Sequence, residues 1–248
     1  MKETHVGRWA RTQVIKRLVG DLLHPVRAYA DLTAIYRTGK QLTACLPKRS
    51  LVDLSPGIDQ TEVRIQYWPQ PGGTSMADMT ALILLAKHTN RRSIFEFGTF
   101  RGYTTYNLAL NTHPDSKIYT LDLPGSSIHE AKLELTSLDL IDKEMSGEQF
   151  LGSPVAGKII QLYGDSAAFD YTPYEGEMDL VFVDASHSYG YVLSDSLVAR
   201  RLISTGGIII WHDYPTWPGV WLCLEELKQK WSGRFIWIED TELVIWLS

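Results

Sequence analysis

Apolar and polar positions alternate in a regular order along residues 74–248. Apolar residues at helical spacing predict helices over about 76–89, 102–111, 190–203 and 219–231. Short apolar runs between them predict strands at 93–97, 117–122, 158–163, 178–184 and 208–211. Ser75 is the predicted N-cap of the first helix, and Gly206-Gly207 the predicted stop of the third. A polar stretch at 127–145 is also predicted to be helical.

Repeated strand–helix–strand units predict a parallel sheet that is covered by helices on both faces. Two last strands, at 235–239 and 243–247, are separated by a tight turn and so predict an antiparallel hairpin. The expected fold is therefore a doubly wound α/β domain with a mostly parallel, seven-stranded sheet.

Residues 1–73 differ from the rest of the chain in pattern and in charge. Residues 8–37 have helical spacing with basic side chains, and 46–73 are a connector that ends in Pro71-Gly72-Gly73. We therefore divide the chain into a helical extension, 1–73, and a domain, 74–248. Three roles stay open for the extension: a lid and homodimer arm, a peripheral contact with an anionic membrane surface, or plain packing.

Composition narrows the class of partner and the compartment. Residues 1–50 contain ten Lys/Arg and three Asp/Glu, so the remainder of this chain of net charge −5 is strongly acidic. An acidic body argues against nucleic-acid binding, which needs a broad basic face. Two distant cysteines, Cys45 and Cys223, form no disulfide framework, and no apolar run or signal sequence indicates export or membrane insertion. We expect a cytoplasmic protein.

The segment after the first predicted strand, Glu96-Phe97-Gly98-Thr99-Phe100-Arg101-Gly102, has the glycines of a ligand-binding turn. A dinucleotide fingerprint has a glycine where Phe100 stands, which makes room for a pyrophosphate. The bulky ring therefore favours an adenosine ligand without phosphates. Asp122, which ends the second strand, is placed to accept both hydroxyls of a ribose.

These motifs resemble the class I S-adenosylmethionine-dependent methyltransferases, and the match covers about 74–248. Within them, Val183-Asp184-Ala185-Ser186-His187-Ser188-Tyr189 and the segment 206–214 are similar to macrocin-type O-methyltransferases, a bacterial small-molecule group. The resemblance implies a Rossmann-like fold with strand order 3-2-1-4-5-7-6. It also implies a set of cofactor-binding residues, namely Glu96, Gly98, Thr99, Gly102, Asp122, Leu123, Asp165, Ser166 and Asp184.

A candidate reaction centre lies at the ends of the fourth and fifth predicted strands, where Asp184, His187, His212 and Asp213 should converge. A hydroxyl acceptor must lose its proton, and His187 is suited to be the base, with Asp184 and Asp213 as partners. The resemblance implies a magnesium ion on Asp184, His212 and Asp213. His212 departs from that pattern, because magnesium prefers oxygen ligands.

The sequence thus predicts methyl transfer from S-adenosylmethionine to a small molecule, with a hydroxyl as the expected acceptor. A nitrogen or carbon acceptor stays open. So do two other classes, a nicotinamide-dependent oxidoreductase and a non-catalytic binding protein that keeps the cofactor fold. Trp211, Trp217 and Trp221 are candidates either for a substrate pocket or for packing.

Overall fold

The structure is a computed structural model that describes residues 46–66, 73–135 and 145–248. The chain divides into two compact units, Met1–Cys45 and Leu46–Ser248, of which the second is described below. The helix expected over 8–37 lies outside the described residues. No helix in the described part of the chain is long and apolar enough to cross a membrane.

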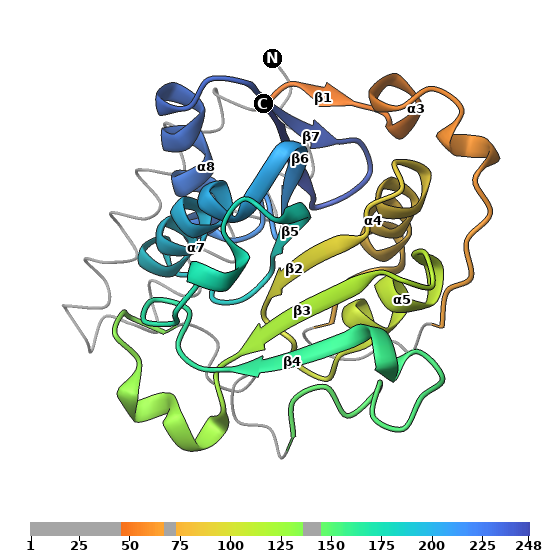
Figure 1. Ribbon diagram of the computed structural model, residues 1–248. Helices are drawn as coiled ribbons and strands as arrows, with labels where there is room; N and C mark the ends of the chain where they lie inside the picture. The colour runs from red at the N-terminus through yellow and green to blue at the C-terminus, as the bar shows by residue number, and fades with distance from the viewer. Residues whose placement is uncertain (1–45, 67–72, 136–144) are drawn as a thin grey trace, which may run out of the picture. The chain divides into compact units, whose positions relative to one another are not determined.

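An eight-stranded sheet forms the centre of the unit, in the order β1-β7-β8-β6-β5-β2-β3-β4 (Figure 1). The strands are β1 Lys48–Arg49, β2 Ser93–Phe97, β3 Lys117–Asp122, β4 Ile159–Tyr163, β5 Met178–Val183, β6 Ile203–Trp211, β7 Arg234–Ile238 and β8 Val244–Leu247. All neighbouring pairs are parallel except those that β8 makes with β6 and β7. The expected Rossmann-like order of seven strands is confirmed, and β1 adds an eighth at the edge.

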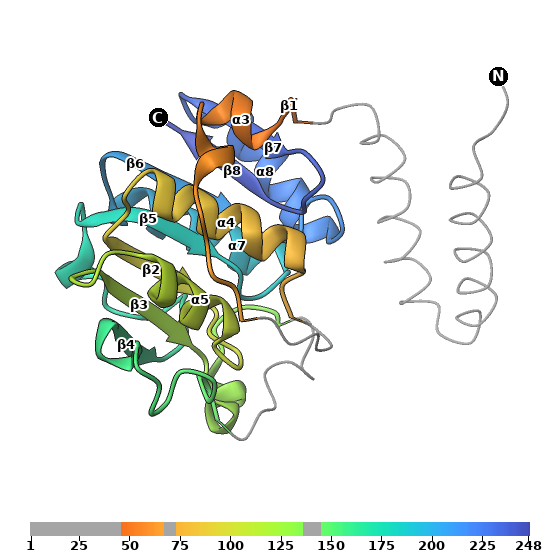
Figure 2. The same cartoon turned by 90° about the vertical axis from the view of Figure 1, so that its right-hand side faces the viewer.

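Among the longer helices of the described residues, two lie on each face of the sheet (Figures 1 and 2). Helices α4, Met76–His88, and α5, Tyr103–Asn111, lie on one face, and α7, Tyr189–Leu202, and α8, Pro218–Lys230, lie on the other. The predicted cap is present, since the Ser75 hydroxyl accepts from the Asp78 amide. Shorter helical elements are α3 Leu51–Leu54 and the 3-10 turns η2 Ile58–Gln60, η3 Gly125–Glu130, η4 Ala156–Lys158 and η5 Thr172–Tyr174.

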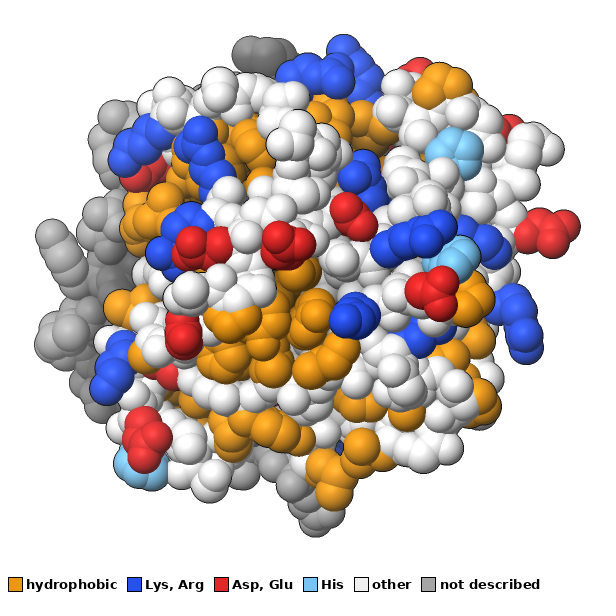
Figure 3. Space-filling view, viewed as in Figure 1, with side chains coloured by type: hydrophobic (Ala, Val, Ile, Leu, Met, Phe, Trp, Pro, Cys, Tyr) orange, Lys and Arg blue, Asp and Glu red, His pale blue; other side chains and the backbone are white. Residues whose placement is uncertain are grey.

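Alternate residues of the central strands point to opposite faces, so the sheet separates two hydrophobic cores. In β2, Phe95 and Phe97 pack into the core beneath α7 and α8, whereas Ile94 packs into the core beneath α4 and α5. Because both faces are buried, the strands read as continuous apolar runs, which is why the sequence locates them well. Figure 3 shows hydrophobic side chains gathered near the middle of one face, with charged side chains of both signs dispersed around them.

Residues 46–66 pack within this unit, although the sequence groups them with the N-terminal extension. Leu46 and Ile58 are buried in the two cores. Two asparagines of α5 hold the segment 61–66, called the strap below. The side-chain amide of Asn111 accepts from the backbone amide of Arg64 and donates to its carbonyl oxygen, and Asn107 makes the same two hydrogen bonds with Gln66. The strap shows no periodicity because distant side chains, rather than its own secondary structure, satisfy its backbone.

Two predicted local features are wrong. The described part of the helix expected over 127–145 is a 3-10 turn that ends at Glu130, and the Lys132 amide then donates to the Asp165 carboxylate at 2.8 Å. Helix α7 ends at Leu202, and Gly206-Gly207 lie inside β6 instead of stopping the helix. In both places a tertiary contact overrides the local signal; for β6 it is the pairing of Ile203 with Met178 of β5.

Candidate active site

The turn between β2 and α5 is shaped by its contacts with other parts of the protein. Gly98 has φ +87°, and a Cβ there would lie 2.1 Å from the Asp184 carbonyl oxygen. Gly102 has φ +85°, and a Cβ there would lie 2.7 Å from the Phe150 ring. Both glycines are therefore required for the turn to pack against the end of β5 and the loop at 147–150. Phe100 also has positive φ, at 49°.

Glu96 lies behind this turn with only 1% of its surface exposed. Its carboxyl group accepts hydrogen bonds from the hydroxyls of Thr105, on α5, and Thr120, on β3. Burial raises its pKa to about 8 despite these two bonds. Thr99 is also buried, and its hydroxyl pairs with Thr120 at 2.7 Å and accepts from Gln161. Glu96 and Thr99 thus brace the turn from within.

The ends of β3 and β4 supply the other predicted cofactor residues. Asp122 ends β3 and accepts from the Ser146 hydroxyl. Asp165, after β4, accepts from the Ala167 amide and the Tyr191 hydroxyl, both at 2.9 Å, so its carboxylate organises its own loop. Leu123 and Ser166 are half-buried beside them. Because β2, β3 and β4 are parallel neighbours, all these groups lie at one edge of the sheet.

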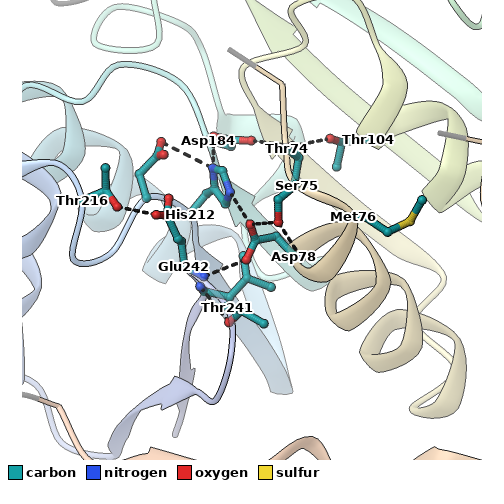
Figure 4. A network of polar contacts seen from close by, with 12 residues as sticks. Thr74, Ser75, Met76, Asp78, Thr104, Asp184, His212, Thr216, Thr241 and Glu242 are labelled. Atoms are coloured by element: carbon teal, nitrogen blue, oxygen red, sulfur yellow. Dashed lines mark hydrogen bonds and ion pairs between the residues drawn. The ribbon is translucent and has the colours of Figure 1, made fainter. Parts of the chain in front are cut away.

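His212, at the end of β6, lies in a cage of carboxylates that joins three elements (Figure 4). Its Nδ1 is 3.1 Å from Asp184 and 3.4 Å from Asp213, and its Nε2 is 3.3 Å from Asp78 of α4. These carboxylates outweigh the desolvation of the buried ring and hold the pKa of His212 well above its ordinary value. Asp78 also accepts from the Glu242 amide at 2.7 Å, which ties α4 to the turn between β7 and β8.

His187 forms a second pair beside this cage. Its Nε2 is 2.7 Å from Oδ2 of Asp213, and both side chains are only slightly exposed. The indole of Trp217 stacks on the imidazole with a centroid separation of 4.4 Å and an interplanar angle of 10°. The two histidines together hold the pKa of the Asp213 carboxyl far below its usual range, although burial acts in the opposite direction.

The three predicted metal ligands do converge. One ligand atom each of Asp184, His212 and Asp213 lies within 4.8 Å of the others. The contact of His212 Nε2 with Asp78 is the kind of outer partner that orients metal-binding imidazoles and leaves Nδ1 toward the ion. The donor set therefore fits a divalent ion, and its imidazole suits zinc or iron better than magnesium.

A cavity of about 580 Å³ opens over these groups. It brings together all four residues of the predicted reaction centre, Asp184, His187, His212 and Asp213. Of the three tryptophans considered in the sequence, only Trp217 lines it, whereas Trp211 and Trp221 are buried in the core. The remaining lining residues are Lys48, Gly73, Ser75, Asp78, Pro215, Trp237, Asp240, Thr241 and Glu242.

Sequence reasoning missed Asp78, Lys48 and the turn between β7 and β8. Asp78 carries a visible signal, since Ser75 and Asp78 have the spacing of a helix-capping pair, and the Ser75 hydroxyl lies 2.5 Å from the Asp78 carboxylate. That local role gave no indication that the same carboxylate contacts His212. Lys48 and Glu242 lie in segments without any recognisable motif, and only the sheet topology brings them to the cavity.

Comparisons with known proteins agree with this architecture. Residues 95–214 match a family model described as a methyltransferase domain. No curated protein sequence matches the chain. A solved structure of the Podospora anserina methyltransferase PaMTH1 with bound S-adenosylhomocysteine is similar, with 18% identity, a TM-score of 0.54, and 88% of this chain and 94% of that chain covered.

Two further solved structures are similar at the same level. One is TomG of Streptomyces achromogenes, an O-methyltransferase of tomaymycin synthesis in complex with S-adenosylmethionine, with 18% identity, a TM-score of 0.50, and 87% and 95% coverage. The other is an O-methyltransferase of Bacillus cereus with S-adenosylhomocysteine, with 16% identity, a TM-score of 0.50, and 85% and 96% coverage. Identities this low show a shared fold.

Proposed function

We propose that this chain is a class I S-adenosylmethionine-dependent methyltransferase and that it methylates a hydroxyl group of a small molecule. The contact of His187 with Asp213 in the wall of the cavity carries this proposal. The similar structures that are named O-methyltransferases support a hydroxyl acceptor over a nitrogen or carbon acceptor.

The pair is arranged for removal of a proton from the acceptor. The Asp213 carboxylate accepts from Nε2 of His187, so Nδ1 carries the lone pair of the neutral imidazole. The acceptor hydroxyl gives its proton to Nδ1 while its oxygen bonds to the methyl carbon. The Asp213 carboxylate then faces the imidazolium that forms, and the indole of Trp217 keeps the ring in place by stacking on it.

S-adenosylmethionine, when bound, supplies a methyl group on a sulfonium, and the sulfur keeps the electron pair of the broken S–C bond. We assign its ribose to Asp122, its adenine to Leu123 and Ser166, and its methionine part to the turn that Gly98 and Gly102 allow. The absence of the middle glycine at Phe100 supports a ligand without a pyrophosphate. A divalent ion on Asp184, His212 and Asp213 would orient the acceptor and lower the pKa of its hydroxyl.

Calorimetry on the full chain tests the cofactor assignment. We expect S-adenosylhomocysteine to bind and NAD⁺ not to bind. Asp122→Asn should weaken binding roughly tenfold, because a charged acceptor for two hydroxyls is lost. Asp115→Asn, at a carboxylate that is 82% exposed, is the matched control and should bind normally. Binding of NAD⁺ in place of S-adenosylhomocysteine would instead support the oxidoreductase, and full physiological output without His187 would support a binding protein.

A further inference from the structure

The more exposed part of the cavity is lined by acidic, basic and aromatic side chains that methyl transfer itself does not require. Its residues come from distant parts of the chain: Lys48 from β1, Trp217 from the start of α8, Trp237 from β7, and Asp240 and Glu242 from the turn before β8. None of them belongs to strands β2, β3 and β4, whose ends carry most of the predicted cofactor residues, so they are placed to meet the acceptor.

Negative charge prevails in the cavity wall. Five carboxylates line it, from Asp78, Asp184, Asp213, Asp240 and Glu242. The cationic side chains of the lining are Lys48 and the two histidines, so the carboxylates of the protein are in excess even when both imidazoles are charged. A divalent ion on Asp184, His212 and Asp213 would offset the charge of those residues but not that of Asp240 and Glu242. Three of the carboxylates already face the histidines, which leaves Asp240 and Glu242 as the source of the excess charge.

The two tryptophans of the lining present faces on which positive or planar groups already lie. The Lys48 ammonium lies 3.8 Å from the ring centroid of Trp237, and the His187 imidazole stacks on Trp217. An ammonium over an indole face is attracted by the ring quadrupole. The position of Lys48 therefore shows that this wall of the cavity accommodates an ammonium group against the face of Trp237.

We propose that the acceptor is a ring compound that carries an ammonium group, bound by Asp240 and Glu242 beside Trp237, with its hydroxyl at His187. This inference rests on the proposed function, since it concerns the acceptor of that same site. Like charge across an interface is unfavourable, so phosphorylated acceptors, carboxylates and coenzyme A esters are disfavoured.

Three catechols with the same ring and hydroxyls but different side-chain charge test the proposal: dopamine, 4-methylcatechol and 3,4-dihydroxyphenylacetate. Their binding to the full chain is measured by calorimetry in the presence of S-adenosylhomocysteine. We expect dopamine to bind about tenfold more tightly than 3,4-dihydroxyphenylacetate, with the neutral compound between them. Substitution of both Asp240→Asn and Glu242→Gln should bring the three affinities within about twofold of one another.

Two further variants sharpen the test. Lys48→Met removes the competing ammonium and should strengthen dopamine binding. Asp115→Asn combined with Glu130→Gln removes the same number of charges at exposed positions, and should leave the order of affinities unchanged. Asn tolerates the left-handed backbone that Asp240 adopts, at φ 59°, so the double variant keeps the turn.

The proposal is overturned if the anionic catechol binds as well as dopamine, if no catechol binds, or if the double variant keeps the preference. The same samples report S-adenosylhomocysteine binding separately. Loss of that binding in the wild-type chain would count against the proposed function. The order of the affinities of the three catechols tests only the inference about the acceptor.

Discussion

At the scale of single residues, the predicted site consists of side chains that are held by other protein groups. Asp165 is engaged by its own loop and by Tyr191, and Glu96 by two threonines. His187 is also held, by Asp213 and by the stacked indole of Trp217, but its side chain lines the cavity. The residue types indicated the chemistry, whereas their partners decide which of them can act on a ligand.

His187→Gln should lower methyl transfer by about 10²- to 10⁴-fold, because the base is lost while the shape of the side chain is roughly kept. S-adenosylhomocysteine affinity should not change, since His187 is assigned to the acceptor. The rate is followed as S-adenosylhomocysteine release with an acceptor that the wild type methylates. His129→Gln, at a side chain that is 77% exposed, is the control. A rate within a few-fold of wild type would exclude His187 as the base.

Glu96→Gln should make stability less dependent on pH. The pKa of Glu96 is about 8 in the folded chain, against an ordinary value of 4.5. Between these values the folded state holds a proton that the unfolded state has released, so stability falls as pH rises through this window. Glutamine mimics the protonated carboxyl, since its carbonyl can accept from Thr105 and Thr120.

Urea unfolding at pH 5.5 and pH 8.5 measures this effect. The stability of Glu96→Gln relative to wild type should increase at the higher pH. Glu130→Gln, an exposed substitution, should shift the midpoint equally at both values. Equal shifts for Glu96→Gln as well would show that the buried carboxyl has an ordinary pKa.

At the scale of elements, the site depends on the close approach of the start of α8 to the loop between β5 and α7. The start of α8 abuts the loop that carries His187. A Cβ on Gly219, in the first turn of α8, would lie 2.2 Å from the His187 carbonyl oxygen and 2.7 Å from the Tyr189 amide nitrogen. This glycine, which no motif singles out, therefore sets the position of the proposed base.

Gly219→Ala should lower both stability and activity, because the backbone of the His187 loop must move to admit a methyl group. The expected loss of unfolding free energy is about 1–3 kcal/mol. Gly157→Ala is the matched control, since nothing lies within 4 Å of a Cβ there. Urea unfolding and the rate of methyl transfer are measured for both variants. An unchanged rate for Gly219→Ala would show that the loop adapts without cost to function.

At the scale of the whole molecule, Leu46–Ser248 is a compact unit with its own two cores. Its edge strand β1 follows directly after residues 1–45, and Leu46 donates its amide to the Tyr214 hydroxyl. The roles considered for the basic N-terminal residues, as lid, homodimer arm or membrane contact, stay predictions. The cytoplasmic location and the absence of nucleic-acid binding stay predictions too.

A chain without residues 1–45 should still unfold cooperatively and bind S-adenosylhomocysteine within about threefold of the full chain, because the proposed cofactor residues and both cores lie in the remainder. Thermal unfolding and calorimetry compare the two chains. A truncated chain that is insoluble or loses cofactor binding would show that the first 45 residues complete the fold.

Much of this architecture was readable from the sequence, for a physical reason. Strands buried on both faces give unbroken apolar runs, and helices between them give a 3.6-residue period, so both are local signals. The order of the seven strands followed from the resemblance. The convergence of Asp184, His187, His212 and Asp213 on one cavity was predictable because they closely follow the ends of neighbouring parallel strands, which meet at one edge.

Only the tertiary structure decided which polar groups meet. Asp78 looked like a simple helix cap, yet it holds His212 across 134 residues of sequence. Asparagines of α5 order a strap that has no pattern of its own, and Asp165 ends a helix-prone stretch early. Such contacts join residues that are remote in the chain and depend on angles and distances set by packing, which no local pattern encodes.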